Sequence, residues 1–334
     1  MLIHILSKIK YILLYYVLGA KGILHDFLYS KYNHVELKDK SNYVAVVTGG
    51  ARGIGKEIVR KLMQCNMHVV IGCRDVKKGE SVIQELRDAG VRTGEASVIE
   101  LDLKSLKSVK KFADTFLQRH KYLNLLVNNA GIMFVPYEET EDGVESHLAV
   151  NYLGHFLLSH LLLPALTKAD RQFSENARII NVSSCAHEVS PRINFDDIYM
   201  KKNYIEQAAY SQSKMCQLMF TKYFNKYLRK LDTGIQVIAV HPGVVDTEIF
   251  NGTLVKMTAP WALHLFCKVC KTPDQGATGV IYCCIEDELE KAGGKYYSNC
   301  TLQNCISYVD EVEEQERLYE ISKKIVKDFL PKLE

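Results

Sequence analysis

The sequence predicts an α/β fold built on a doubly wound parallel sheet of about seven strands, with helices on both faces. Short apolar runs rich in β-branched residues recur along the chain, and each is typical of a parallel strand buried on both sides. Segments with apolar residues at helical spacing alternate with these runs, which indicates crossover helices over a parallel sheet. The length of 334 residues suits one large domain of this kind with additions.

The expected elements follow one another within a domain that spans residues 41–300. The strands are expected at residues 44–47, 67–72, 97–101, 123–127, 178–182, 235–240 and 295–297. The helices are expected at residues 56–63, 77–89, 105–118, 143–167 and 208–231, with a further helix after residue 272. Several helix ends carry capping signals, namely Ser105 and Thr272 before a helix, Pro273 at a first helical position and Gly90 after a helix.

A glycine-rich turn joins the first expected strand to the first expected helix. Residues 48–55 read TGGARGIG. Glycines at such a turn let a pyrophosphate approach the backbone, and the amide groups and dipole of the following helix favour an anion. The turn therefore predicts a Rossmann-like, dinucleotide-binding fold, with a βα turn that needs glycine only for tight turning as the alternative. The expected cofactor-binding residues of this turn are Gly49, Arg52, Gly53, Ile54 and Gly55.

The end of the second expected strand bears on which dinucleotide is bound. An acidic residue at this position binds the ribose hydroxyls of NAD(H), whereas an arginine accommodates the 2′-phosphate of NADP(H). Arg74 comes first here, and Arg52 lies in the nearby glycine turn, where its guanidinium could pair with phosphate. We expect NADP(H), while Asp75 keeps NAD(H) possible and simple surface charges are the alternative for both arginines.

Further motifs follow the later strands in a fixed order. They read LDL at 101–103, NNAG at 128–131, NYLGHF at 151–156, SS at 183–184, YSQSK at 210–214 and HPGVVDT at 241–247. Together with the TGxxxGxG form of the glycine turn, they resemble the short-chain dehydrogenase/reductase family over about residues 43–297. Within this family, residues 73–75 and the NYLGHF motif are similar to the retinol dehydrogenases. Residues 133–136 and 271–277 look more like the branch of the dehydrogenase/reductase member named for chromosome X.

The resemblance implies further cofactor contacts at the carboxyl ends of the strands. Asp102 would contact the adenine, and the amide-rich segment after the fourth strand would line the cofactor. The loop after the sixth strand would engage the nicotinamide carboxamide through the backbone at Val245 and the hydroxyl of Thr247. The implied set is Asp102, Leu103, Asn129, Ala130, Gly131, Pro242, Gly243, Val245 and Thr247, with Tyr210 and Lys214.

Tyr210 and Lys214 share one face of an expected helix, because they lie four residues apart. A tyrosine with a pKa of about 10 is a poor acid or base at neutral pH. A lysine ammonium one turn away, together with the cationic nicotinamide, favours the phenolate and lowers that pKa. The resemblance implies that Tyr210 is the acid and base, that Ser184 bonds the substrate oxygen, and that Asn151 completes a proton relay.

Position in the chain selects these residues over similar ones. A second Tyr-x-x-x-Lys pattern begins at Tyr319, but it lies in a polar tail rather than after the fifth strand. Ser184 is preferred to Ser183 because the family places its functional serine second in such a pair, and adjacent strand residues face opposite sides. His155 is expected to pack or bond structurally.

Residues 1–40 do not resemble part of the core. Their longest uncharged run is about ten residues, or about 15 Å of helix, which is half the hydrocarbon thickness of a bilayer. We expect a retained membrane anchor, with a cleaved signal peptide and a soluble helix as alternatives. A location at the endoplasmic reticulum or on lipid droplets fits this expectation better than secretion does.

Two further segments lie outside the expected sheet. Residues 250–271 form an amphipathic insertion, either a lid over an apolar substrate or a segment that packs on the body. Residues 301–334 form a charged helical tail. The ten cysteines show no zinc pattern, so no metal site is expected, and a redox pair at Cys267 and Cys270 is a minor alternative. The net charge of +3, without a basic stripe, argues against nucleic acid as a partner.

The sequence thus predicts an NAD(P)-dependent oxidoreductase that interconverts a lipophilic alcohol and its aldehyde or ketone. The retinol branch implies retinoids, and the other branch implies polyprenol or dolichol substrates. The alternatives are a steroid or other carbonyl reductase, a non-catalytic nucleotide-sensing scaffold, and a sugar-nucleotide epimerase, whose usual GxxGxxG turn is absent. A homodimer through the two long helices is implied by the resemblance alone.

Overall fold

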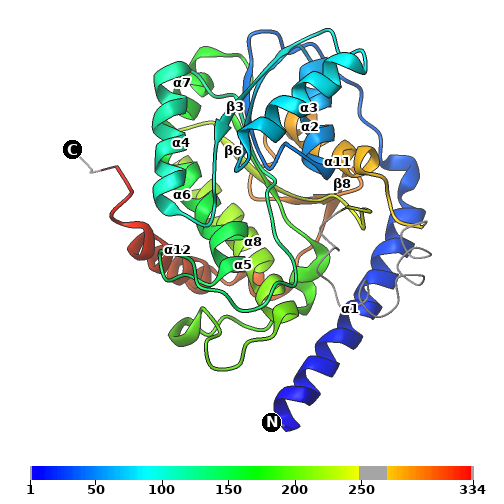
Figure 1. The fold of residues 1–334 in the computed structure, drawn as a ribbon, viewed down its shortest axis with the longest axis vertical. Helices are drawn as coiled ribbons and strands as arrows, with labels where there is room; N and C mark the ends of the chain where they lie inside the picture. Colours follow the sequence, from blue (N-terminus) through cyan, green and yellow to red (C-terminus); the bar gives the residue numbers. More distant parts are fainter. Residues whose placement is uncertain (1, 248–268, 332–334) are drawn as a thin grey trace.

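The computed structural model describes residues 2–247 and 269–331, in which one eight-stranded sheet lies between two layers of helices (Figure 1). The strand order is β3-β2-β1-β4-β5-β6-β7-β8, and all neighbours are parallel except β7 and β8. The order reverses between β1 and β4, which is the place where doubly wound sheets bind ligands. The strands are β1 (Val44–Thr48), β2 (His68–Cys73), β3 (Glu95–Glu100), β4 (Leu125–Asn128), β5 (Arg178–Val182), β6 (Gln236–His241), β7 (Tyr296–Ser298) and β8 (Thr301–Gln303).

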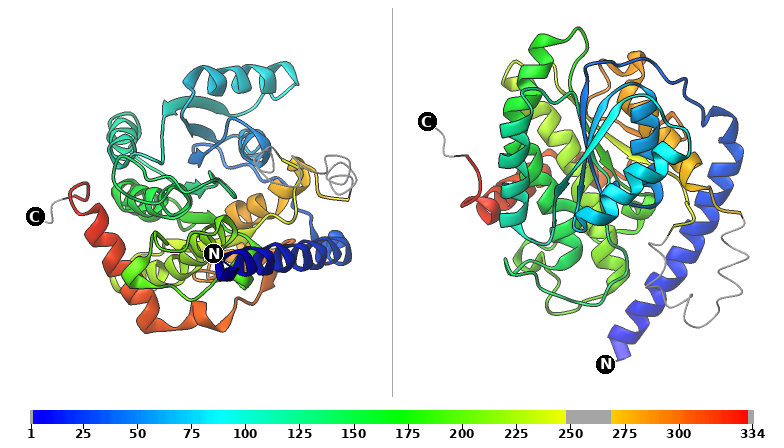
Figure 2. Two further views of the ribbon diagram at one scale, coloured as in Figure 1. Left: turned by 60° about the horizontal axis from the view of Figure 1, so that its bottom comes forward. Right: turned by 45° about the horizontal axis from the view of Figure 1, so that its top comes forward.

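The helices cover both faces of the sheet and enclose two hydrophobic cores (Figures 1 and 2). Apolar residues of α4, α6 and α8 bury one core, and those of α2, α3 and α11 bury the other. The helices are α1 (Leu2–Leu28), α2 (Gly53–Gln64), α3 (Val76–Asp88), α4 (Leu106–Arg119), α5 (Ser146–Leu148), α6 (Gly154–Leu161), α7 (Leu163–Gln172), α8 (Glu206–Lys230), α11 (Pro273–Ile285) and α12 (Val312–Val326).

The expected fold class is confirmed, and the sheet has one strand more than the predicted seven. The additional strand is β8, an antiparallel edge strand of three residues, which is too short for its side chains to show a recognisable period. The expected caps are also present: the Ser105 hydroxyl accepts from the Ser108 amide, and Thr272 forms a capping box with Gln275. The expected lid insertion, residues 250–271, lies outside the described residues except for its last three, and Cys267 lies outside them too.

The single helix expected at residues 143–167 is interrupted twice. One π-helical segment, η2 (Ala149–Leu153), contains Asn151, and a bend of 56° separates α6 from α7. Pro164 lies in the first turn of α7, where its missing N–H removes a donor that would have no partner within the helix. The apolar pattern continues through both interruptions, so periodicity alone predicted one uninterrupted helix.

The C-terminal helix α12 packs on the body, although its sequence reads as a polar tail. Tyr319 is only 3 % exposed, and its hydroxyl lies 3.0 Å from His160 Nε2 in α6. Its ring also lies 4.5 Å from the ring of Tyr223 in α8, measured between centroids. The hydroxyls of Tyr152 and Ser322 add a buried hydrogen bond of 2.8 Å between η2 and α12. Helix α12 therefore packs against α6 and α8 together, through Tyr319.

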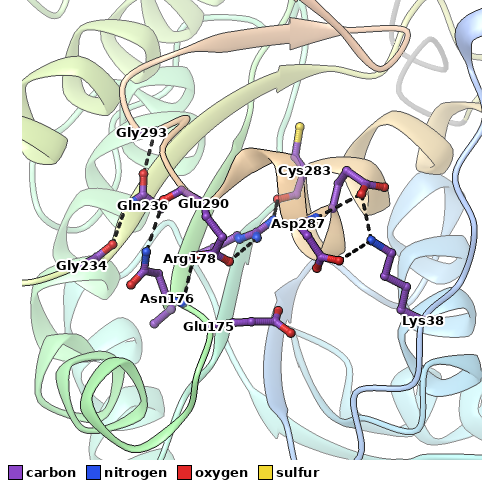
Figure 3. Close-up of polar contacts among 12 residues, drawn as sticks. Lys38, Glu175, Asn176, Arg178, Gly234, Gln236, Cys283, Asp287, Glu290 and Gly293 are labelled. Atoms are coloured by element: carbon purple, nitrogen blue, oxygen red, sulfur yellow. Dashed lines mark hydrogen bonds and ion pairs between the residues drawn. The ribbon is translucent and has the colours of Figure 1, made fainter.

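A polar network links several segments around Arg178, at the amino end of β5 (Figure 3). Arg178, at the start of β5, is 1 % exposed and donates to Glu290 at 2.7 Å and to the Cys283 carbonyl at 3.2 Å. Lys38 donates to Asp287 at 2.8 Å, which ties the segment after α1 to the same region. These acceptors keep the buried Arg178 guanidinium from being an uncompensated charge, so the network has a structural role.

Helix α1 lies along the outside of the body, and its N-terminal end projects beyond it (Figures 1 and 2). Within the described part of the chain, no single helix combines the length and hydropathy needed to cross a bilayer. One bent pair, residues Ser146–Leu161 with Leu163–Gln172, reaches that composition, and most of its first helix is buried in the core.

Candidate active site

A cavity of about 340 Å³ opens at the carboxyl ends of β1, β2, β4 and β5. The cavity runs from the glycine turn to the Tyr210 and Lys214 side chains, so it joins the two ends of the predicted site. Gly243 and Val245 of the predicted cofactor set do not line it, and neither do Ser184 and Asn151. The predicted residues that line it are Gly49, Arg52, Gly53, Ile54, Gly55, Arg74, Asp102, Leu103, Asn129, Ala130, Gly131, Tyr210, Lys214, Pro242 and Thr247.

The glycine turn has the geometry that a pyrophosphate needs. Gly49 and Gly53 have φ values of +69° and +52°, which L side chains rarely adopt. A Cβ atom on Gly55 would lie 2.2 Å from the Gly49 carbonyl oxygen, so only glycine fits at the start of α2. The open backbone and the amino end of α2 together suit the diphosphate of a dinucleotide.

Amide side chains at the end of β4 hold the strand ends in register. Asn129 donates its side-chain amide to the Thr48 carbonyl at 2.9 Å, and its backbone N–H donates to the Thr48 hydroxyl at 2.9 Å. Asn128 donates to Asn181 on β5 at 2.8 Å. His155 Nε2 lies 2.9 Å from the same Thr48 hydroxyl, and burial lowers the pKa of His155 to about 3. His155 is thus a neutral structural residue here, as the sequence suggested.

The corner expected to hold the adenosine ribose is basic. Arg74 and Arg52 line the cavity there, and so does Lys78, which the sequence reading missed. The Asp75 carboxylate accepts a hydrogen bond from the Lys78 backbone N–H at 3.0 Å and thereby caps α3. Lys78 lies one helical turn after Asp75. The sequence offers two adjacent lysines there, Lys77 and Lys78, and does not show which of them faces the cavity.

Tyr210 lies in the first turns of α8 and is 6 % exposed. Its apolar neighbours include Leu18, Met133 and Ala186, which form one cluster with it. The ring of Phe134 packs edge-on against Tyr210, with centroids 5.6 Å apart. Burial raises the pKa of the Tyr210 phenol above its ordinary value, and a hydrogen bond with Ser184 lowers it in part.

Lys214 lies one turn further along α8 and is 4 % exposed. Its ammonium donates to the Val182 carbonyl at 2.9 Å and to Gln217 Oε1 at 3.0 Å, both of which are neutral acceptors. Burial lowers the pKa of Lys214 to about 7, and the ammonium lies 5.8 Å from the centre of the Tyr210 ring. The sequence led us to expect that this ammonium lowers the Tyr210 pKa. Among the groups of the chain itself, burial has the larger effect on the pKa of Tyr210 and of Lys214.

The two serines after β5 have different roles, and Ser184 is the one that reaches Tyr210. Ser184 also accepts from the Ala186 backbone N–H at 3.1 Å, which fixes its rotamer. Ser183 lines the cavity, and its hydroxyl donates to the Lys214 carbonyl at 3.1 Å. The choice of Ser184 rested on the alternation of side chains along a strand. The different partners of Ser183 and Ser184 are consistent with that alternation.

Asn151 lies in the π-helical segment and is fully buried. Its side-chain oxygen accepts from the Ile132 N–H at 2.9 Å, and its side-chain nitrogen donates to the Ile132 carbonyl at 3.0 Å and to Ser213 at 2.9 Å. These contacts fix the segment after β4 relative to α8, beside the Tyr210–Lys214 pair. Asn151 therefore contacts residues next to the site, but it does not line the cavity itself.

A cavity that suits a dinucleotide, with a buried tyrosine and a buried lysine in its lining, is compatible with a nicotinamide-dependent oxidoreductase. The model of the short chain dehydrogenase family matches residues 43–256. Retinol dehydrogenase 12 of Mus musculus is 41 % identical over 279 residues, which cover 84 % of each chain. Polyprenol dehydrogenase of Danio rerio is 36 % identical over 287 residues, covering 85 % of this chain and 86 % of that protein.

A solved structure gives the same result for the fold. An uncharacterised protein from Mycobacterium paratuberculosis superposes with a TM-score of 0.70 at 30 % identity, and the match covers 87 % of this chain and 96 % of that one. The chain belongs to the short-chain dehydrogenase family, and it is an NAD(P)-dependent alcohol dehydrogenase of that family.

Proposed function

We propose that this enzyme transfers hydride between NADP(H) and a lipophilic alcohol or aldehyde of the retinoid or polyprenol type. The observation that carries the proposal is the apolar and aromatic surrounding of Tyr210, formed by Leu18, Met133, Phe134 and Ala186. Such a surrounding favours a hydrocarbon substrate over a sugar or a hydroxy acid. The names of the two relatives, a retinol dehydrogenase and a polyprenol dehydrogenase, support the same substrate class.

The residues around the phenol divide the proton chemistry among them. When bound, a nicotinamide cofactor supplies or accepts the hydride, and its oxidised ring adds a positive charge to this buried site. In the reductive direction Tyr210 donates its phenolic proton to the substrate oxygen, and in the oxidative direction the phenolate accepts it. Ser184 hydrogen-bonds the same substrate oxygen, and Lys214 supplies a cation beside the Tyr210 ring. Asn151 holds the segment after β4 in place against α8, next to this pair.

The proposal is tested by a turnover screen of the full-length protein with NADPH and with NADH against retinal, a polyprenal and a steroid ketone. We expect reduction of a retinoid or polyprenoid aldehyde, faster with NADPH. Cofactor binding without turnover of any of the three would instead favour a nucleotide-sensing role.

The preference for NADP(H) rests on the three cations at the adenosine corner and on the engagement of Asp75 as a helix cap. We predict that Arg74→Ala weakens NADPH binding about 10- to 100-fold, because a charge-assisted hydrogen bond to phosphate contributes about 1.5–3 kcal/mol. NADH binding should change less than threefold. Titration of cofactor fluorescence measures both, with Arg119→Ala on the exposed end of α4 as the control. Equal weakening for both cofactors would contradict the assignment.

We also propose that the outer face of α1 binds a membrane surface, that of the endoplasmic reticulum or a lipid droplet. Leu13, Val17, Leu24 and Phe27 on this face are 59 %, 69 %, 58 % and 75 % exposed. A helix that exposes such residues can lie in the interface of a bilayer.

For this reason Leu13→Glu with Leu24→Glu should lower binding to phospholipid vesicles at least about tenfold, since burying one leucine contributes about 1.5–3 kcal/mol. Vesicle co-sedimentation measures it. Leu302→Glu, at a leucine of similar exposure in β8, is the control and should sediment like the unmodified protein. Equal sedimentation of all three would remove the membrane role of α1. We do not extend the proposal to a dimer through α6 and α8, because α12 packs on the side these helices share.

A further inference from the structure

Helix α1 is bound to the catalytic body along one face. The Tyr15 hydroxyl lies 2.6 Å from the Ser211 hydroxyl and donates to the Gln207 carbonyl at 3.1 Å, both on α8. Leu18 is 6 % exposed within the Tyr210 cluster. Lys21 pairs with Glu188 at 2.5 Å. The bound face of α1 thus reaches the catalytic helix and the segment after β5.

The same face of α1 also contacts the loop that follows β6. Gly22 is buried, and a Cβ atom there would lie 2.9 Å from Val244. One turn later, the Asp26 carboxylate accepts a hydrogen bond from the Val244 backbone N–H at 2.7 Å. Gly243 has φ of +94°, and a Cβ atom on it would lie 2.7 Å from Asp26. The close approach therefore depends on glycine at both places.

Asp26 is the centre of a buried polar cluster around this loop. Its carboxylate lies 3.4 Å from the Lys271 ammonium and accepts from Asn299 at 3.0 Å. Lys271 also donates to the Pro242 carbonyl at 3.3 Å and to Asn299. Asp26 and Lys271 are 8 % and 9 % exposed, and burial lowers the pKa of Lys271 while Asp26 opposes that shift. The backbone from Pro242 to Val244 is therefore held from two sides by one ion pair.

The position of this loop matters to the cavity. Pro242 and Thr247, which flank the segment held by Asp26, line the same cavity as Tyr210 and Lys214. A shift of about 1 Å at a substrate- or cofactor-positioning element can lower a rate about a hundredfold.

We propose that Asp26 of α1 is a positioning residue for the reaction, because it fixes the Pro242–Val244 backbone beside the nicotinamide end of the cavity. The inference rests on the proposed hydride transfer. It makes α1 a working part of the active site in addition to its proposed role at a membrane. The sequence pattern of residues 1–40 does not by itself indicate a contact with the active site.

The test uses the full-length protein with Asp26→Asn, which keeps the shape of the side chain and removes its charge. We expect kcat to fall at least tenfold, while the Kd for NADPH changes less than threefold, since the adenosine corner is untouched. The fluorescence yield of the bound reduced nicotinamide should also change, and this readout needs no substrate. Asp39→Asn, whose carboxylate bonds Ser41 and Asn66, is the matched control and should match the unmodified protein in all three.

The double variant Asp26→Ala with Lys271→Met removes both charges and covers the case in which the single variant folds poorly. It should show the same loss of kcat and the same change in fluorescence. A kcat and a nicotinamide fluorescence within twofold of the unmodified protein, in either folded variant, would overturn the inference, even with a lowered melting temperature. If the unmodified protein binds NADPH but reduces no aldehyde, the proposed function fails, and the fluorescence comparison still decides the role of Asp26.

Discussion

Replacing Tyr210 with Phe should lower kcat/KM for a retinoid or polyprenoid aldehyde by about 10²- to 10⁴-fold, which is the range expected when a general acid is removed. The ring stays in its cluster with Leu18, Met133 and Phe134, so the fold is retained. The Kd for NADPH should stay within a few-fold, because only the hydroxyl is lost. Steady-state kinetics and cofactor titration on the same preparation measure the two quantities.

The chain offers its own control for this variant. Tyr319 begins the second Tyr-x-x-x-Lys pattern and bonds His160 on the far side of α6. Tyr319→Phe should lose about 1 kcal/mol of stability with the hydrogen bond and keep its turnover. Comparable losses of turnover in the two variants, or an active Tyr210→Phe enzyme, would contradict the assignment of Tyr210 as the acid.

Replacing Lys214 with Met should lower kcat/KM at least about 100-fold. A cation 5.8 Å from the Tyr210 ring contributes about 3 kcal/mol at an effective dielectric constant of about 20, and that is about a hundredfold in rate. Lys222→Met, two turns along α8 at a surface pair with Asp310, is the control and should keep its activity. If Lys214→Met keeps more than a tenth of the unmodified turnover, the proposed role of Lys214 in assisting Tyr210 is wrong.

The pH dependence of stability gives a second readout of Lys214. Burial lowers its pKa from 10.5 to about 7 in the folded protein. Between about pH 7 and pH 10 the unfolded chain then binds one proton more at this site, so this lysine makes the free energy of unfolding rise with pH. Below about pH 7 Lys214 is protonated in both the folded and the unfolded protein, so burying its charge lowers the free energy of unfolding by the full amount. Chemical denaturation without cofactor should show a smaller rise over this window in Lys214→Met than in the unmodified protein.

The sequence predicted the sheet and most of the cavity because both depend on local signals. Buried strands read as apolar runs, as at β5, whose bounds match the prediction. The glycine turn requires particular backbone angles at Gly49 and Gly53, which only a few residue types can adopt. Chemistry-bearing motifs at strand ends then fall together because parallel strands share one carboxyl edge.

The remaining features depend on contacts between distant segments. Leu18 and Asp26 look like ordinary residues of an apolar N-terminal segment, and only the folded chain places them beside Tyr210 and Val244. The break around Asn151 leaves the apolar periodicity intact, so only the amide within an apolar helix and the resemblance to the family pointed to it. The state of Lys214 depends on how completely it is buried, which spacing does not encode.

The central claim, hydride transfer to a lipophilic aldehyde with Tyr210 as the proton donor, is tested most directly by isotope transfer. The full-length protein is incubated with NADPH deuterated at the transferable C4 position and with retinal or a polyprenal, and the alcohol is analysed by mass spectrometry. We predict one deuterium on the carbinol carbon of the product, and almost none with Tyr210→Phe. No labelled alcohol from either aldehyde, with NADPH demonstrably bound, would contradict the account.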